Sequence, residues 1–514
     1  MALEEIVGPV MVGPSSSHTA GAVRLGNLAR LCWGGEVTDV DIYLRCSFAA
    51  TFWGHGTDRA LLAGLMGFSP SDEALKDSFR IAAERGVRYR FHGEKVDGAH
   101  PNSVRFVIRE GERTMEVVGA SLGGGAVELQ EVDGFVLRAT GELPTMVTFH
   151  RDEPGVIAAV TAILAEAGIN VGSMNVHRQG RGKGAAMVLE LDGLPPEQVV
   201  ERIKGCHSAI RAPDVDTRRR GGSAMRSFES ILERCRSLPL PEAILSMEEE
   251  ERGLPRDVIA GRMLDRLREM KSSVLSVEQR PPRGRLVGGE GEALEAYRRS
   301  QGALSGDLVA TACSMAMKVA VGNAAMRRIV ACPTAGSCGI VPGVLGAYSR
   351  LNDPSEEELL KALIVAGAVG SVIAQRATLA GAEGGCQAEC GAAAAMAAAA
   401  LTYLRGGDPE AVFHSSALVL QSIMGLVCDP IAGLVEVPCV LRNGTMVGMA
   451  VLCSDLAMAG IRSTVPPDEV VDAMDSVGLA LPSALRETSE GGLAATPTGQ
   501  RIARQLLSEA PRLD

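Results

Sequence analysis

Three cysteines stand in loops or at helix ends, where thiolates could hold a metal or an inorganic cluster. Cys386 lies in GAEGGCQAECG, and Cys428 and Cys439 flank the loop CDPIAGLVEVPC. Glycines beside Cys386 let the backbone approach a cluster closely, and prolines stiffen the second loop. Thiolates are the usual ligands of a [4Fe–4S] cube. Cys390 and Cys338 compete for the same role, so spacing alone leaves the ligand set open.

A second group of polar residues lies in three loops near the start of the chain. His18 stands in GPSSSHTAG, His55 in WGHGTDRA and His100 in GAHPNS. The alternative for SSSHT is a helix cap, made by Ser17 or Thr19. Hydroxyl and amide groups in these loops can donate hydrogen bonds to a carboxylate, namely those of Ser15, Ser16, Ser17, Thr57 and Asn102.

The loops must be positioned by two different kinds of domain. Residues 1–143 predict an α/β domain, because VTDVDIYLRCSF alternates as strands do and DRALLAGLMGF has helical spacing. From residue 226 to 514 the strand pattern disappears, and helices rich in Ala, Met, Val and Leu are expected, with the cysteines in their loops. A polar linker, DTRRRGGSAM at 216–225, precedes them.

Between these two regions, residues 144–215 predict a compact unit of order βαββαβ, the ferredoxin-like arrangement. The stretch DEPGVIAAVTAILAEAGINVGSMNV resembles an ACT domain, a regulatory module that binds amino acids at its interfaces. The resemblance implies that Gly155 and Asn170 lie at the ligand-binding turn; alternatively, both are only turn residues. Pairing of such modules makes a homodimer the expected assembly.

Composition limits the classes of function. The 514 residues are 46% hydrophobic but only 3% aromatic, with 60 glycines, which is typical of closely packed helices with small side chains. The net charge of -11 gives no electrostatic reason to bind nucleic acid. The apolar tracts at 362–374 and 391–404 are shorter than the roughly 18–20 residues that span a bilayer, so no membrane helix is expected.

The expected compartment is the cytoplasm. The stretch MALEEIVGPVMVGPSSSHTAG has no basic segment before an apolar core, so no secretory signal is predicted. In a reducing compartment, twelve cysteines favour metal binding, catalysis or plain burial over disulfides. Plain burial is the expectation for Cys32, Cys46, Cys206, Cys235, Cys313, Cys332 and Cys453.

Several long motifs resemble those of the iron–sulfur L-serine dehydratases. These are GPSSSHT, GHGTD and HPN in the first domain, and PTAGSCGIVPGVL, GGCQAE, CDPIAGLVEVPC and GGLAATPTG in the last region. The resemblance covers nearly the whole chain and implies a fusion of the family's β portion, an ACT domain and its α portion. By motif it implies a [4Fe–4S] cluster held by Cys386, Cys428 and Cys439, with one iron left open. Some relatives fill that iron with a terminal cysteine; here none follows Cys453, so water, hydroxide or substrate is expected.

The resemblance implies elimination of water from L-serine to give pyruvate and ammonia. The open iron would act as a Lewis acid on the hydroxyl group. His55 would remove the α-proton, with Asp58 or Thr57 orienting it. His100 and His18 would place the substrate or deliver a proton. The reacting centre would then lie between the first and last domains.

Three other functions fit parts of the pattern. A pyridoxal phosphate enzyme could use SLGGGAV and Lys318, but the familiar Ser-x-Lys setting and a glycine-rich tetrad are missing. The same cluster chemistry could eliminate sulfide from L-cysteine. An amino-acid or redox sensor without catalysis could use the ACT domain and the cysteines, although a sensor does not need the polar loops.

Overall fold

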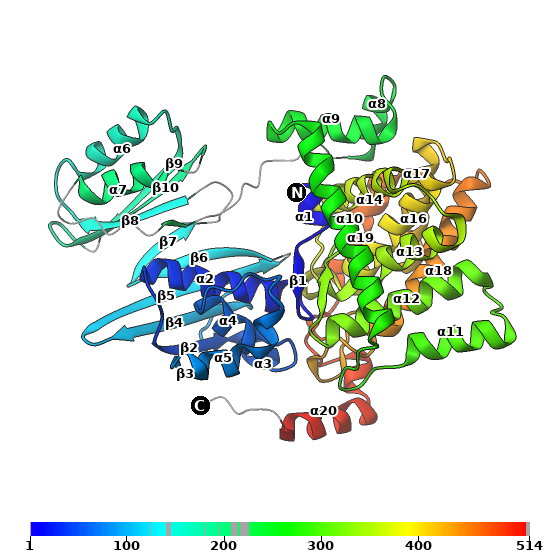
Figure 1. Cartoon of the computed structure of the whole chain (residues 1–514), viewed down its shortest axis with the longest axis horizontal. Helices are drawn as coiled ribbons and strands as arrows, with labels where there is room; N and C mark the ends of the chain where they lie inside the picture. The colour runs from blue at the N-terminus through cyan, green and yellow to red at the C-terminus, as the bar shows by residue number, and fades with distance from the viewer. Residues whose placement is uncertain are drawn as a thin grey trace.

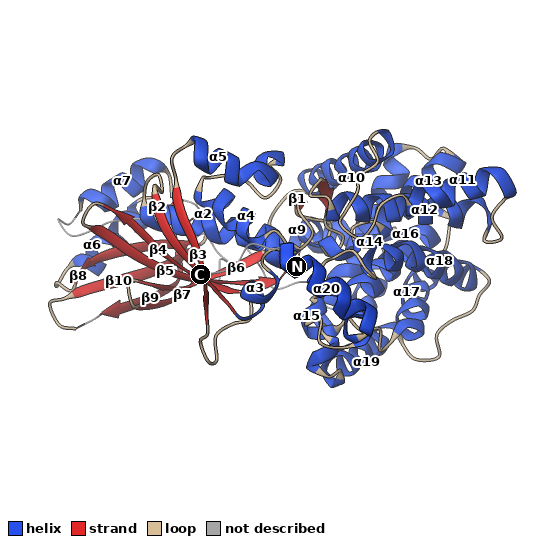
Figure 2. Cartoon of the chain, turned by 90° about the horizontal axis from the view of Figure 1, so that it is seen from below, coloured by secondary structure: helices blue, strands red, loops and turns tan. Residues whose placement is uncertain are grey.

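The structure is a computed structural model in which helices and strands gather in separate parts of the molecule (Figures 1 and 2). The first two regions carry the sheets, and the last region is helical, which confirms the predicted fold class. Among the residues described, no helix is long and apolar enough to cross a bilayer. The described residues are 2–123, 125–139, 145–178, 180–193, 195–206, 214–215, 225 and 227–509.

The first region contains a six-stranded sheet of order β3-β2-β4-β5-β6-β7. All neighbours are antiparallel except β2 and β3, which are parallel. Strand β2 alternates: Val40, Ile42 and Leu44 are buried in a core shared with the helices α2 and α4, whereas Asp41 lies on the other face. The bounds are α2 Ala22–Trp33, β2 Asp39–Arg45, α3 Cys46–Thr51, α4 Thr57–Leu65, α5 Ser78–Glu84, β3 Arg88–Glu94, β4 Ser103–Glu110, β5 Arg113–Gly123, β6 Ala126–Val132 and β7 Phe135–Ala139.

The second region has the predicted βαββαβ order. Its antiparallel sheet has the strand order β11-β8-β10-β9. Met146 and Met187 pack on the helix side of this sheet, while Val147 and Val188 join the core of the first region. The ACT-like unit therefore packs directly on the first region. Its elements are β8 Thr145–Arg151, α6 Val156–Glu166, β9 Val171–Arg178, β10 Gly184–Leu191, α7 Glu197–Gly205 and β11 Asp214–Val215; the predicted linker at 216–224 lies outside the described residues.

The last region packs its helices around the alanine-rich α16, whose residues 392–402 are all buried. Alanine side chains allow neighbouring helices to approach closely, and α14 and α18 both pack on α16. The helices are α8 Phe228–Cys235, α9 Leu240–Arg252, α10 Arg256–Gln279, α11 Glu290–Gln301, α12 Gly306–Ala324, α13 Ile340–Asn352, α14 Glu356–Arg376, α15 Gly381–Gly384, α16 Ala392–Leu404, α17 Pro409–Ile423, α18 Cys439–Met458, α19 Pro467–Ala480 and α20 Pro497–Glu509.

The start of the chain crosses into the helical region (Figure 1). Helix α1 (Leu3–Ile6) is buried in the helical core, and β1 (Val10–Val12) pairs antiparallel with β12 (Arg328–Val330). The approach is close: a Cβ atom at Gly370 would lie 2.3 Å from the Ile6 side chain. The first and last regions are therefore joined by shared core and by a shared sheet, and their loops meet beside this junction.

Candidate active site

The first histidine loop folds into a π-helical turn, Ser16–Gly21, directly before α2. Ser15 caps this turn, because its Oγ accepts a hydrogen bond from the backbone N–H of His18 (3.1 Å). The cap predicted for Ser17 or Thr19 is thus made by Ser15. The Nε2 atom of His18 lies 3.0 Å from Ser47 Oγ, at the start of α3. Short π-helical turns often occur at functional sites.

The second histidine loop packs directly on the first. Thr19 Oγ1 donates to the backbone oxygen of His55 (2.8 Å), and the rings of His18 and His55 lie edge to face with centroids 4.4 Å apart. Burial lowers the pKa of His55 to about 4. Burial and the neighbouring His55 also lower the pKa of His18 well below its usual value. Both imidazoles are therefore neutral near pH 7.

His55 is buried with neither ring nitrogen hydrogen-bonded within the described structure. The carboxylate of Asp58 instead accepts from the backbone N–H of Arg59 (2.7 Å), and burial raises its pKa to about 6. The Thr57 hydroxyl is likewise buried, with no hydrogen-bond partner among the described residues. The orienting bond predicted from Asp58 or Thr57 to His55 is therefore not present in this structure.

The third histidine loop reaches the others through Ser47. The backbone N–H of Ser47 donates to the oxygen of Pro101 (2.9 Å), while its hydroxyl contacts His18. Within the loop, the backbone N–H of Asn102 donates to Nδ1 of His100 (3.1 Å). Burial lowers the pKa of His100, and the carboxylate of Glu383, on α15 of the helical region, opposes this effect. All three loops thus face the helical region.

One hydrogen bond joins the first loop directly to the loop CPTAGSC, and Asn323 of α12 bridges the two loops with two more. The backbone N–H of Ala335 donates to Ser16 Oγ (2.9 Å). The amide of Asn323 donates to the backbone oxygens of Pro14 (3.2 Å) and Ala335 (2.8 Å). A Cβ atom at Gly54 would also lie 3.3 Å from the oxygen of Gly433 in the cysteine loop. The structure therefore brings together loops that are hundreds of residues apart in sequence.

Four thiols lie on the helical side of this junction. Cys386 precedes a π-helical turn, Gln387–Gly391, and Cys439 begins α18. The Cys428 backbone pairs with the tail: its N–H donates to the Leu485 oxygen (2.9 Å), and its oxygen accepts from Glu487 (2.8 Å). A hydrogen bond from the Cys390 thiol lowers the pKa of Cys386, and the positive charge of the nearby Arg442 guanidinium lowers it further.

The thiols of Cys386, Cys428 and Cys439 lie close enough together to shift one another's pKa. Burial raises the pKa of Cys428 and Cys439 well above the usual value, and the neighbouring Cys386 raises both further. Cys338, in contrast, is buried beside Cys332, and burial raises its pKa to about 12. The three motif cysteines and Cys390 are thus the candidate ligands.

The donor set fits a cluster better than a single ion. Within the described ranges, no three His, Cys, Asp or Glu side chains are placed to hold one metal ion. A sulfide-bridged cluster spaces its protein ligands more widely, because each thiolate binds a different iron. A glycine also lies against one of these thiols: a Cβ atom at Gly381 would lie 3.5 Å from Cys428 Sγ. Thiols that lie beside a glycine, where no side chain separates the backbone from the sulfur atom, are compatible with an iron–sulfur cluster.

The cysteine loop is braced by a buried ion pair. Arg442 donates to Asp429 Oδ1 (2.8 Å) and to the backbone oxygen of Val427 (2.7 Å). Asp429 Oδ2 accepts from the backbone N–H of Leu493 (2.7 Å), so it also holds the chain before α20. Only 4% of the Asp429 side chain is exposed, which places this pair among the buried ones.

Replacing Asp429 by alanine should destabilise the chain by about 3 kcal/mol, because it leaves the guanidinium of Arg442 buried and unpaired. The expected result is a lower thermal midpoint and poorer retention of iron. Glu356→Ala is the matched control, because the exposed pair of Glu356 with Arg268 should contribute less than about 1 kcal/mol. Equal midpoints for the two variants would contradict the bracing role.

Two glutamates that we did not predict also face the cysteines. Glu389 and Glu487 are both partly exposed. Burial raises the pKa of Glu389 to about 7 and that of Glu487 to about 8, and each lies close enough to influence the thiol of Cys386. Glu389 ends the motif GGCQAE quoted above, and Glu487 lies four residues before the motif GGLAATPTG, which was the available signal.

Backbone strain gathers at the same junction. Four residues other than glycine have left-handed backbones here: Cys46 (φ +44°), Ala432 (φ +56°), Glu487 (φ +63°) and Ser489 (φ +60°). Cys46 precedes Ser47 beside His18, and the other three belong to the cysteine loop or to the tail against it. Such conformations cost energy and tend to cluster at functional sites.

The residues predicted to bind a regulatory ligand lie in the ACT-like unit. Gly155 begins α6 with φ +96°, a conformation that favours glycine. Asn170 precedes β9, and its amide donates to Asp192 (2.8 Å). Gly155 lies in a turn and Asn170 in the irregular segment between α6 and β9, and binding of a regulatory ligand there stays a prediction.

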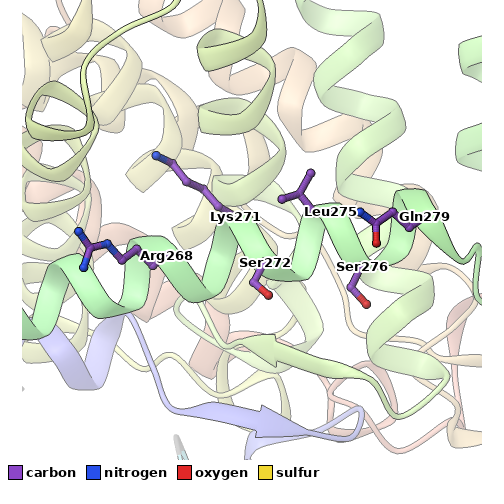
Figure 3. A pocket seen from close by; sticks show the side chains of 6 residues that line it. All are labelled: Arg268, Lys271, Ser272, Leu275, Ser276 and Gln279. Atoms are coloured by element: carbon purple, nitrogen blue, oxygen red, sulfur yellow. The ribbon is translucent and has the colours of Figure 1, made fainter.

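A shallow surface pocket lies elsewhere, along α10 (Figure 3). None of the predicted site residues lines it, and its Arg268 is already paired with Glu356. It therefore adds nothing to the candidate active site. Its lining residues are Arg268, Lys271, Ser272, Leu275, Ser276 and Gln279.

Comparison with known proteins covers every region of the chain. The family model described as serine dehydratase beta chain matches residues 7–84, the ACT domain model matches 145–207, and the serine dehydratase alpha chain model matches 235–494. The L-serine dehydratase of Streptomyces coelicolor is 30% identical over 493 residues, which cover 94% of this chain and 96% of the relative. The chain belongs to the L-serine dehydratase family.

Other L-serine dehydratases show the same organisation in one chain or two. The L-serine dehydratase TdcG of Escherichia coli is 28% identical over 94% of this chain and 96% of its own length. In Bacillus subtilis, the probable alpha chain is 49% identical over 44% of this chain and 75% of its own length. The probable beta chain is 38% identical over 41% of this chain and 96% of its own length. The resemblance seen in the motifs, a single-chain L-serine dehydratase with an ACT domain, is confirmed.

Proposed function

We propose that this L-serine dehydratase uses a [4Fe–4S] cluster held by Cys386, Cys428 and Cys439 to eliminate water from L-serine, giving pyruvate and ammonia. The observation that carries the proposal is the junction itself. The buried Cys386 and Cys428 and the partly exposed Cys439 gather on one side, and two buried neutral histidines lie on the other side of a contact made by Ser16 and Ala335. When bound, the cluster would supply a Lewis-acidic iron that makes hydroxide a better leaving group.

The histidine side supports removal of the α-proton. A general base must be unprotonated at the working pH, and burial keeps His55 neutral with both ring nitrogens unoccupied. His18 is fixed by Ser47, so its role is to place the substrate or to hold a proton rather than to move freely. The Asp58 carboxylate lies in the first turn of α4, where it accepts a hydrogen bond from the backbone N–H of Arg59 and not from His55.

The carboxylate of serine needs hydrogen-bond donors. The Ser16 hydroxyl already donates to Met11 Sδ (3.9 Å), and Ser15 Oγ lies 3.4 Å from His18 Nδ1. Ser17, Thr57 and Asn102 are therefore the more available donors among the predicted set. The buried Thr57 hydroxyl is the strongest of these, because it has no partner in the described structure and a buried polar group without one is costly.

The ACT domain is proposed to bind an amino-acid effector at the turn of Gly155 and Asn170. Support comes from its packing: Val147 and Val188 belong to the same core as α2, which follows the His18 loop. A change in this unit could thus reach the histidine side through packed side chains. Assembly as a homodimer and a cytoplasmic location stay predictions.

The proposed function is tested by anaerobic purification followed by an assay of pyruvate. We expect about four irons and four sulfides per chain, and pyruvate release from L-serine that depends on them. L-cysteine is the matched substrate: faster release of sulfide and pyruvate from it would make the chain a desulfidase. A preparation with an intact cluster and no product from either amino acid would contradict catalysis and favour a sensor.

A further inference from the structure

A short turn between α10 and α11 lies beside the cysteine loop. The backbone N–H of Gly284 donates to the oxygen of Val287 (2.9 Å) and closes this turn. The Val287 side chain is buried in a small core with Val440, which lies in the first turn of α18. Residues 284–287 therefore rest on the helix that begins with Cys439.

Glu436 of the cysteine loop holds this turn in place. Only 4% of Glu436 is exposed, and its carboxylate accepts hydrogen bonds from three successive backbone N–H groups. The donors are Arg285 (3.1 Å), Leu286 (2.6 Å) and Val287 (3.2 Å). A Cβ atom at Gly284 would lie 2.6 Å from Glu436 Oε2, so the turn has no room for a side chain at this position. Several N–H donors on one buried carboxylate form a strong link, because such a group is costly to leave unpaired.

The turn presents Arg285 to the first region. The guanidinium carbon of Arg285 lies 3.7 Å from the centre of the Trp53 ring. Trp53 stands two residues before His55, in the second histidine loop. Burial raises the pKa of Asp58 in the same loop, and the positive charge of Arg285 is among the effects that lower it. An arginine of the helical region thus covers an aromatic ring in the loop of the proposed base.

The second histidine loop also touches the cysteine loop directly. A Cβ atom at Gly54 would lie 2.9 Å from Leu434 Cδ2, and Leu434 stands two residues before Glu436. Residues 434–436 therefore support this loop twice, once through Leu434 and once through the turn that carries Arg285. Two supports restrict the position of the loop, and a displacement of about 1 Å can cost an enzyme a hundredfold in rate.

We propose that Glu436 is a positioning residue, which holds Arg285 on Trp53 and thereby fixes the second histidine loop against the cysteine loop. Glu436, Arg285 and Trp53 together are called the tryptophan clamp. The proposal rests on the proposed function for the role of His55 in this loop. None of the three residues needs to touch the substrate, so the clamp should act on kcat more than on KM.

The kinetic test compares two single variants with the double variant, all as full-length, anaerobically purified chains. Arg285→Met should lower kcat for L-serine about threefold to tenfold, the effect expected from loss of a cation–π contact. Glu436→Gln should lower kcat about tenfold to a hundredfold, because it disturbs three hydrogen bonds to a buried carboxylate. KM should change less than about threefold. The double variant should be no slower than Glu436→Gln alone, since both changes release the same contact.

A second measurement follows the clamp without reference to activity. The chain has 2 tryptophans, and Trp33 is only 1% exposed, so acrylamide quenching of fluorescence reports mainly on the partly exposed Trp53. Arg285→Met and Glu436→Gln should each raise the quenching constant about twofold, because the guanidinium no longer covers the ring. Arg285→Lys, which keeps a cation over the ring, should recover part of both kcat and protection.

The matched control is the other arginine that lies over a tryptophan. Arg113 covers Trp33 (3.8 Å to the ring centre) at the start of β5, and Arg113→Met should leave kcat unchanged. Iron and sulfide are quantified for every variant, so that cluster loss is not mistaken for loss of the clamp. If Glu436→Gln does not fold, Arg285→Met decides the question, because the Arg285 side chain is exposed.

Three results would overturn the proposal. The first is an Arg285→Met variant with the kcat and the quenching constant of the wild-type chain. The second is a double variant whose loss in kcat is the product of the two single losses, which would give the residues separate roles. The third is a rise in KM at constant kcat, which would make Arg285 a ligand of the substrate. A wild-type chain that makes no pyruvate would refute the proposed function instead, and quenching would still decide whether Glu436 and Arg285 act together on Trp53.

Discussion

Serine in place of Cys386, Cys428 or Cys439 should remove the cluster and lower pyruvate formation from L-serine by about a thousandfold or more. The reason is that, in the proposed function, each thiol would supply one of only three protein ligands, and a Lewis-acidic iron would contribute several kcal/mol to the transition state. Iron and sulfide content, visible absorbance and initial rates are measured on the same anaerobic samples. Loss of absorbance and of activity should occur together.

Cys390 provides the sharpest comparison for this prediction. Its thiol is hydrogen-bonded to Cys386, yet it does not stand at a motif position for a ligand. Cys390→Ala should therefore keep most of the iron and most of the activity. Cys453→Ala, a change within α18, controls for the loss of a buried thiol as such. Loss of iron from Cys390→Ala, with full iron in one of the three serine variants, would reassign the ligands.

Replacing His55 by glutamine should lower kcat by about a hundredfold to ten-thousandfold while the iron content stays normal, because a general base contributes an effect of that size. Since burial lowers the pKa of His55 to about 4, the imidazole is fully neutral above about pH 5. Protonation of His55 should therefore not limit the wild-type rate between pH 5 and 8. Rates of L-serine turnover across this range, with iron quantified at each pH, measure both effects.

The control for the histidine prediction is His177→Gln, which changes an exposed histidine of β9 in the ACT domain. Its kcat should match that of the wild-type chain. A His55→Gln variant that keeps its activity, together with a large loss in His100→Gln, would move the base to the third loop. A pH profile that falls with an apparent pKa near 6.5 would indicate that the base is an exposed histidine, not the buried one.

Regular patterns in the sequence predicted the regular parts of the fold. The βαββαβ unit was predictable because strand alternation and helical spacing follow one another within short, clearly bounded segments. The crossing of residues 3–12 into the helical core was not, because α1 and β1 are too short to show any period. What holds them is their packing against residues such as Ile329 and Met263, far along the chain.

The site was predictable to the extent that its motifs were. The thiols and the loop histidines could be named from the resemblance, but their partners could not, since Ser47 and Ala335 are joined to them only by the tertiary fold. Glu389 and Glu487 were missed for a different reason. A glutamate in a loop is usually solvated, and only the three-dimensional arrangement shows that these two lie beside the cysteines.

The burial of residues 3–7 in the helical core also affects the order in which the protein folds during synthesis. Leu3 and Ile6 leave the ribosome long before the residues that bury them, which include Gly367, Gly370 and Met396. At about 5–20 residues per second, some twenty seconds or more of translation separate the two. During that time most of the helical core in which Leu3 and Ile6 are finally buried has not yet been synthesised. Closure of the catalytic junction is therefore a late event in biogenesis, completed only when most of the polypeptide has emerged.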